Sequence, residues 1–250
     1  MRTAPALLAA TLIVAAPAFA EYKEIEVTNG ATIAGQVRVV GEIPKLPPQP
    51  VYKQKETCGT ELPDPRLVVG KNGALQNAIV YLTDIKSGKA VHLDEPVKLD
   101  NLKCAFVPHV TTASVGQTLD IHNSDPFLHD AHARLGAQTL FNVAIMKDHT
   151  VHQPLMEPGL IHLNCNIRHT WMHGYILVSE HPYHTVTDAE GRFRLEGIPP
   201  GIWTVRVWHE LLGSVDRQVR VGAGETSTQE ITLQGAAAAA GEAEQAEEKQ

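Results

Sequence analysis

Residues 157–172 read EPGLIHLNCNIRHTWM and combine a short predicted strand with three side chains that can bind a metal. Apolar and polar residues alternate up to Cys165, which is typical of a β-strand with one buried face. Cys165 shares the apolar face, so we expect its thiol to point inward. His169 and Met172 follow in the turn beyond the strand, and a thiol, an imidazole and a thioether therefore lie within eight residues.

A matching segment lies upstream, at residues 115–132, which read VGQTLDIHNSDPFLHDAH. Leu119 and Ile121 alternate as in a strand, residues 123–126 have turn chemistry, and His129 follows directly. A soft thiolate, imidazoles and a weak thioether are the donors of a mononuclear copper electron-transfer site. We therefore expect the two segments to meet around a metal ion.

Together these segments resemble the cupredoxin family over residues 97–181. In that family an Asn/Asp-rich turn carries the first His, and a strand that begins with Pro-Gly carries the Cys, followed by a second His and a Met. The resemblance implies a Greek-key β-sandwich that binds one copper ion per chain. His129, Cys165 and His169 would be its equatorial ligands, and Met172 its weak axial ligand.

The ligand loop departs from the common family pattern. Its spacing, C-x3-H-x2-M, is shorter on the Met side than in plastocyanin or azurin and is similar to the second half of the binuclear copper loop of cytochrome oxidase subunit II. The first Cys of that loop would fall at position 161, which is Ile, so a mononuclear site is expected. His132 and His173 are alternative ligands, which leaves both a blue and a red copper site open.

Residues 185–210, TVTDAEGRFRLEGIPPGIWTVRVWHE, resemble the transthyretin-like regulatory domain of carboxypeptidases. The resemblance implies a small accessory β-sandwich over residues 182–234, without peptidase activity. Gly35-Gln-Val37 and Ala78–Leu82 match the opening strands of that domain. Two arrangements stay open: residues 21–96 supply the first part of a split sandwich into which the copper segment is inserted, or they form an unrelated extension.

The remaining pattern predicts an all-β chain, because no amphipathic helix pattern exceeds three turns. Residues 41–66 are Pro-rich and are expected to be irregular. Outside the copper segment, short apolar or alternating runs predict strands at residues 32–40, 75–83, 193–195, 203–207, 218–221 and 230–233.

Both ends of the chain have distinctive compositions. Residues 1–20 read as a secretory signal, with Arg2 at the start, a short apolar run and a small-residue cleavage site at Ala18-Phe-Ala20. The apolar run is too short to span a bilayer, so we expect no membrane span and a periplasmic or secreted protein. Residues 235–250 are rich in Ala, Glu and Gln without apolar periodicity and are expected to be disordered.

The chain contains three Cys, and in an oxidising compartment this number predicts one disulfide and one spare thiol. If Cys165 binds the metal, Cys58 and Cys104 remain as the pair. The alternative is that one of these two residues is a buried thiol.

Composition and motifs narrow the range of possible functions. A formal net charge of −7 argues against nucleic acid as a partner. We favour electron transfer over catalysis, with a periplasmic cytochrome or an oxidoreductase as partner and an exposed imidazole, His173 or the edge of His169, as the electron port. The alternatives are copper delivery, which the presence of only four Met disfavours, and an open-site red-copper enzyme.

Overall fold

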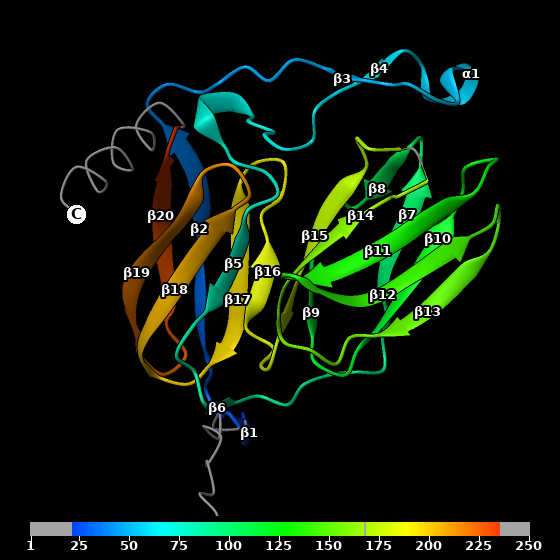
Figure 1. Ribbon diagram of the computed structural model, residues 1–250. Helices are drawn as coiled ribbons and strands as arrows, with labels where there is room; N and C mark the ends of the chain where they lie inside the picture. Colours follow the sequence, from blue (N-terminus) through cyan, green and yellow to red (C-terminus); the bar gives the residue numbers. More distant parts are fainter. Residues whose placement is uncertain (1–21, 168, 236–250) are drawn as a thin grey trace, which may run out of the picture.

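The computed structural model describes residues 22–167 and 169–235, which form two β-sandwiches that lie side by side (Figure 1). The prediction of an all-β chain is confirmed. The predicted secretory signal and the predicted disordered tail beyond residue 235 lie outside the described residues. Within the described part of the chain, no helix is long and apolar enough to cross a membrane.

The first sandwich consists of two sheets that come from the middle of the chain. One sheet has the strand order β13-β10-β7-β8, with β7 at Val97–Leu102, β8 at Ala105–Val107, β10 at Thr118–Asn123 and β13 at Thr150–Pro154. The other has the order β12-β11-β14-β15-β9, with β9 at Val110–Ser114, β11 at His129–Leu135, β12 at Gln138–Ile145, β14 at Gly159–Asn164 and β15 at His173–Ser179.

The alternation in the sequence determines which side chains fill the core of this sandwich. Leu119 and Ile121 on β10 and Ile161 and Leu163 on β14 are fully or almost fully buried between the sheets. Cys165 follows β14 directly and continues the same face, so its thiol is buried as predicted.

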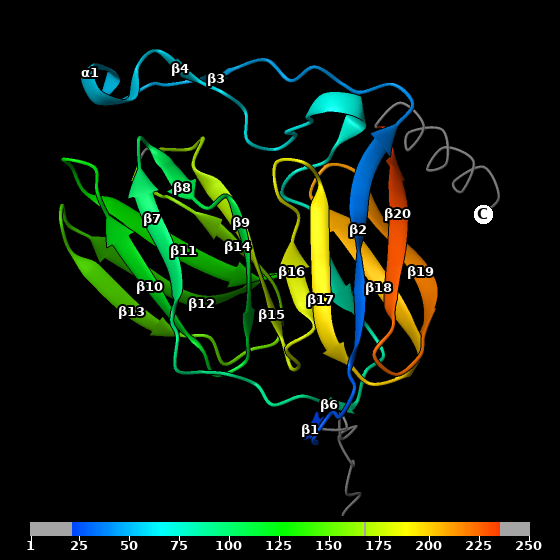
Figure 2. The ribbon, with the colours of Figure 1, turned by 180° about the vertical axis from the view of Figure 1, so that it is seen from behind.

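The second sandwich is built from strands that precede the first sandwich in the sequence and strands that follow it. Its sheets have the orders β16-β5-β18-β19 and β17-β2-β20 (Figure 2). The strands are β2 at Ala31–Val40, β5 at Ile79–Leu82, β16 at His184–Val186, β17 at Arg192–Ile198, β18 at Gly201–His209, β19 at Gly213–Val221 and β20 at Thr226–Gln234. Because β2 lies between β17 and β20, and β5 between β16 and β18, residues before and after the first sandwich share one core.

A long connection between β2 and β5 crosses over one end of the first sandwich before it returns (Figures 1 and 2). Its short elements are β3 at Gln49–Pro50, α1 at Lys55–Cys58, β4 at Glu61–Leu62 and η1 at Lys71–Gly73. A disulfide joins Cys58 on this crossing segment to Cys104, which lies between β7 and β8, with the Cα atoms 5.6 Å apart. The predicted disulfide is therefore present, and it attaches the crossing segment to the first sandwich.

Two further contacts hold the architecture together. The short strands β1, Lys23–Glu24, and β6, Ser87–Gly88, pair in parallel at the opposite end of the molecule. The two sandwiches meet through a small apolar cluster around Ile79, Val110 and Leu177. Tyr175 of the first sandwich and Trp208 of the second pack against it with their ring centroids 5.1 Å apart.

Candidate metal centre

Antiparallel pairing brings the two predicted ligand segments together. β11 and β14 are neighbours, with His132 opposite Asn164, so the beginning of β11 lies beside the end of β14. His129 is the first residue of β11, and Cys165 is the first residue after β14. His169 lies in the turn from β14 to β15 and folds back over the same end of the sheet.

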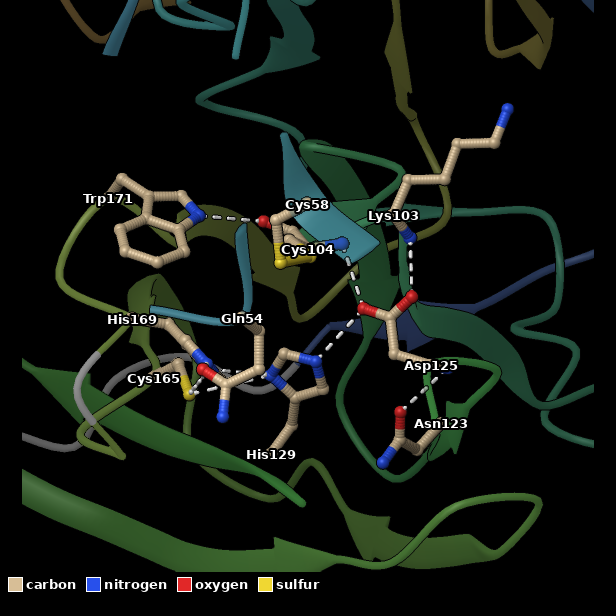
Figure 3. Close-up of a disulfide and its surroundings, with 10 residues drawn as sticks. All are labelled: Gln54, Cys58, Lys103, Cys104, Asn123, Asp125, His129, Cys165, His169 and Trp171. Carbon is tan, nitrogen blue, oxygen red and sulfur yellow. Dashed lines mark hydrogen bonds and ion pairs between the residues drawn. A yellow bond between two sulfur atoms is a disulfide. The ribbon is translucent and has the colours of Figure 1, made fainter. Parts of the chain in front are cut away.

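Three of the four predicted ligands converge on one point, as Figure 3 shows. Sγ of Cys165 lies 3.7 Å from Nδ1 of His129 and 3.5 Å from Nδ1 of His169, and the two Nδ1 atoms are 3.1 Å apart. The three residues are at most 3% exposed. One sulfur and two nitrogen donors therefore face each other in the interior, at separations that an ion bound between them would bridge.

Hydrogen bonds on the far side of each imidazole orient the rings. Nε2 of His129 lies 2.9 Å from Oδ2 of Asp125, and Nε2 of His169 lies 3.1 Å from Oε1 of Gln54. A carboxylate and an amide carbonyl only accept, so both Nε2 atoms donate a proton and both Nδ1 atoms present a lone pair inward. This pattern, in which the outer nitrogen donates and the inner nitrogen is free, is the usual one for metal-binding histidines.

Asp125 is itself held in place from two directions. Its carboxylate accepts the backbone N–H groups of Lys103 and Cys104, at 2.8 Å each. Burial alone would raise the pKa of Asp125, but the hydrogen bond from His129 and these backbone bonds hold that pKa below its ordinary value. The partner of His129 is therefore an ionised carboxylate attached to the same turn as the disulfide.

Burial of Cys165 and His169 favours their uncharged forms in the absence of a cation. Burial raises the pKa of the Cys165 thiol to about 12. Burial, together with the nearby charge of His129, lowers the pKa of His169 to about 4. The imidazole of His169 is therefore readily deprotonated and free to bind a metal ion. A bound cation would supply the positive charge that stabilises the Cys165 thiolate in this environment.

The turn that carries Cys165 and His169 is closed by backbone hydrogen bonds. The N–H of Cys165 donates to the carbonyl of Met172 at 3.2 Å, and the N–H of Met172 donates to the carbonyl of His169 at 2.8 Å. Asp130 accepts the backbone N–H groups of Asn166, at 2.5 Å, and Ile167, at 3.1 Å. The loop is therefore fixed at both ends, which limits rearrangement of its donors.

Aromatic side chains enclose the imidazoles. The ring of Phe127 lies 5.0 Å from that of His129 and 5.4 Å from that of His169, and the ring of Trp171 lies 5.3 Å from that of His169 (centroid distances). The indole N–H of Trp171 donates to the carbonyl of Cys104 at 3.0 Å (Figure 3). These contacts pack aromatic rings against both imidazoles and connect the ligand loop to the disulfide.

The other predicted ligands lie as follows. Met172 is buried and is joined to Cys165 and His169 through the backbone bonds of the loop. His132 is absent from the cluster: its ring nitrogens meet Asn166 and Thr139, each at 2.9 Å, on the outer face of β11. His173 belongs to a separate group with His109 and Glu210.

One expectation about exposure was wrong. The electron port was expected at an exposed imidazole, either His173 or the edge of His169. The His169 alternative is wrong, because His169 is only 1% exposed. The reason is the crossing segment, which places the side chain of Gln54 over its outer nitrogen.

Sequence reasoning missed the residues that support the ligands: Gln54, Asp125 and Asp130. Asp125 and Asp130 stand four residues before and one residue after His129, so their position beside it was a usable signal. Gln54 lies in the Pro-rich segment, 75 positions upstream of His129, and no local pattern relates it to the site.

Residues 176–234 match the carboxypeptidase regulatory-like domain. The predicted resemblance of the C-terminal part of the chain to this domain is therefore confirmed. The match covers the end of β15 and the strands β16 to β20 of the second sandwich, but not β2 and β5. No curated protein matches the chain.

Solved structures to which the chain is similar include cupredoxins. A purple cupredoxin from Nitrosopumilus maritimus is 20% identical with a TM-score of 0.30, over 33% of this chain and 99% of that one. A reduced Cu(I) form of an amicyanin variant is 20% identical with a TM-score of 0.32, over 34% of this chain and 84% of that one. The Cu-containing nitrite reductase NirK from Thermus scotoductus is 23% identical with a TM-score of 0.32, over 40% of this chain but only 25% of the reductase.

Proposed function

We propose that this chain is a mononuclear copper protein that transfers electrons. His129, Cys165 and His169 would be the strong ligands, and Met172 the weak axial ligand. The observation that carries the proposal is the convergence of one Sγ and two Nδ1 atoms, all within 3.7 Å of one another, in a buried pocket. A thiolate with two imidazoles is the donor set of a blue-copper electron-transfer site.

The surroundings of the three donors support electron transfer in particular. A bound copper ion would supply one-electron chemistry between its cuprous and cupric states. The chain supplies a rigid frame: Asp125 and Gln54 orient the imidazoles, and Asp130 fixes the loop after Cys165. Donors that are held in place need little rearrangement when the charge of the ion changes, and a small rearrangement favours rapid electron transfer.

Two alternative functions receive less support. Copper delivery needs donors that a partner's ligands can contact directly, whereas these three residues are at most 3% exposed and electron transfer needs only a close approach. An open-site red-copper enzyme needs a further ligand from His132 or His173. His132 is bonded to Asn166 and Thr139, and His173 is grouped with Glu210. Neither alternative therefore accounts for the geometry as well as an electron carrier does.

We place this function in the periplasm or outside the cell, with one copper per chain and a cytochrome or an oxidoreductase as redox partner. An approach to the metal for such a partner is a surface pocket of about 350 Å³ that Cys165 helps to line, together with His132, Arg134 and Asn166. This route leads to the thiolate side of the site, since Gln54 covers His169.

The test is a redox titration of protein loaded with copper and freed of excess metal. Loading with cuprous ion favours the thiolate site, because Cu(I) selects soft sulfur donors. We expect about one retained copper and a reversible one-electron couple with an intense thiolate-to-copper absorption in the oxidised form. Irreversible loss of copper on oxidation, or a stable preference for zinc under copper excess, would argue for delivery or for a structural site instead.

A further inference from the structure

A second group of metal-type side chains lies where the two sandwiches meet. His109 precedes β9 and His173 begins β15 in the first sandwich, whereas Glu210 lies in the turn between β18 and β19 of the second. One ligand atom from each residue lies within 4.8 Å of the other two. Nε2 of His109 contacts Oε1 of Glu210, and Nε2 of His173 lies 3.5 Å from Oε2 of the same carboxylate.

Both imidazoles are oriented by the main chain. Nδ1 of His109 lies 3.1 Å from the carbonyl oxygen of His173, and Nδ1 of His173 lies 3.0 Å from the carbonyl oxygen of Trp171. A carbonyl only accepts, so each Nδ1 donates its proton and, in a neutral ring, each Nε2 carries a lone pair. Both lone pairs are then directed at one carboxylate, and metal-binding histidines are commonly held in this way.

Burial makes this arrangement costly unless it has a further partner. The side chains of His109, His173 and Glu210 are 7%, 13% and 4% exposed. Among the described residues, Nε2 of His173 is a buried nitrogen without a hydrogen-bond partner. Buried polar atoms normally make a hydrogen bond, and this nitrogen has only the 3.5 Å contact with Oε2 of Glu210, which leaves its lone pair available to an ion bound by both residues.

The neighbouring charges do not supply that group. His162 stands near His173, with ring centroids 6.4 Å apart, and burial lowers the pKa of His162. Arg66 is engaged with Asp64, to which it donates at 2.6 Å. A pocket of about 500 Å³, lined by His173 and Glu210, gives a small ion a route from solvent.

We propose that His109, His173 and Glu210 bind a divalent transition-metal ion and that this ion links the two sandwiches. Two imidazoles and one carboxylate form a donor set used for zinc and for non-haem iron, with positions left for water. The set contains no sulfur, so it suits a harder divalent ion than the site at Cys165. His173 follows Met172 directly, and the two proposed sites are therefore adjacent along the chain.

The competing explanation is a buried ion pair between protonated histidine and Glu210 with no metal. The two explanations differ in what added zinc does. We would titrate Zn²⁺ calorimetrically into the Cys165→Ser variant, and into wild-type protein already loaded with one equivalent of Cu(I). The use of both proteins separates this proposal from the first, because the Cys165→Ser variant tests the second site even if the copper proposal fails.

We expect one zinc ion to bind each protein with similar affinity. Glu210→Gln and His109→Gln should each weaken zinc binding at least tenfold, whereas His122→Gln, on the exposed face of β10, should leave it unchanged. X-ray absorption at the zinc edge should show nitrogen and oxygen ligands without sulfur, and this readout needs no variant that could misfold. No zinc binding, unchanged affinity in both ligand variants, or sulfur in the zinc shell would overturn the proposal.

Discussion

Oε1 of Gln54 lies 3.1 Å from Nε2 of His169, and this contact joins the crossing segment to the proposed copper site (Figure 3). Four residues later Cys58 is bonded to Cys104, whose backbone N–H in turn donates to Asp125, the partner of His129. The two imidazoles are therefore oriented from opposite sides by groups that the same disulfide holds in place.

Replacement of Gln54 tests this arrangement. Gln54→Ala removes the acceptor for the outer nitrogen of His169 and should weaken copper binding roughly 10–100-fold, the usual effect of losing such a partner. Gln54→Glu keeps an acceptor oxygen and should largely restore the affinity. Gln138→Ala, at an exposed position of β12, is the matched control. Equal copper affinities for all four proteins, measured by competition with a chelator, would show that Gln54 only covers the site.

Cys165→Ser should abolish the intense thiolate-to-copper absorption, because it removes the only sulfur donor among the strong ligands. The double variant Cys58→Ser/Cys104→Ser also removes sulfur but leaves Cys165 intact, so it should keep the band. Optical spectra of the copper-loaded proteins provide the measurement. A band that persists in Cys165→Ser would place the copper elsewhere.

Met172→Leu should retain copper and shift the reduction potential upward. A thioether is a weak axial donor, and its loss disfavours the cupric state more than the cuprous state. Met146→Leu makes the same chemical change at a position that is 59% exposed and should leave the potential unaltered. If spectrum and potential are the same in Met172→Leu and wild type, Met172 is not a ligand.

The disulfide should contribute strongly to the stability of the apo protein. In the chain-entropy model a loop of this length, with a sequence separation of 46, is worth roughly 4 kcal/mol. The Cys58→Ser/Cys104→Ser variant should therefore unfold at a clearly lower urea concentration than the wild type. Unchanged unfolding midpoints would mean that the crossing segment is held by its other contacts.

His184 predicts a pH dependence of stability that is separate from the metal sites. Burial, reinforced by the charges of His181 and Lys89, lowers its pKa from 6.5 to about 4. Its Nε2 meets Ser114 Oγ at 3.1 Å, whereas its Nδ1 is buried without a partner among the described residues. A charged ring would therefore place an unsatisfied N–H in the interior.

The direction of the pH effect follows from the lower pKa of His184 in the folded chain than in the unfolded chain. Between pH 6.5 and about 4 the unfolded chain holds the proton of His184 and the folded chain does not, so the free energy of unfolding falls as the pH falls through this window. The total loss is roughly 3 kcal/mol at 1.36 kcal/mol per pKa unit. Urea unfolding at pH 7 and pH 4 should show a smaller loss in His184→Gln than in wild type, and no such difference in the exposed control His149→Gln. Parallel pH profiles for His184→Gln and wild type would contradict this prediction.

Local patterns predicted much of the fold. Alternation identified β10, β14, β17 and β18, because a strand with one buried face leaves a period of two in the sequence. The convergence of His129 with Cys165 was predictable because Cys165 continues one such strand and His129 follows the turn after another. The outward orientation of His132 also follows from this alternation, since it lies an odd number of positions from His129.

The site residues that could not be predicted from the sequence are placed by long-range contacts. Gln54 reaches His169 because the crossing segment passes over the first sandwich, and Pro-rich irregular chain carries no periodic signal of its position. Glu210 reaches His109 and His173 across the contact between the sandwiches, and their sequence separation of up to 101 residues hides the group from any local motif. The expectation that the edge of His169 is exposed failed for the same reason.

The central claim is that one copper ion binds between Cys165, His129 and His169. The most direct measurement is X-ray absorption at the copper edge, on protein loaded with one equivalent of cuprous ion and then oxidised. We predict a first shell with one short copper–sulfur distance and two imidazole nitrogens. A shell of nitrogen and oxygen without sulfur, as the His109, His173 and Glu210 group would give, would contradict the claim.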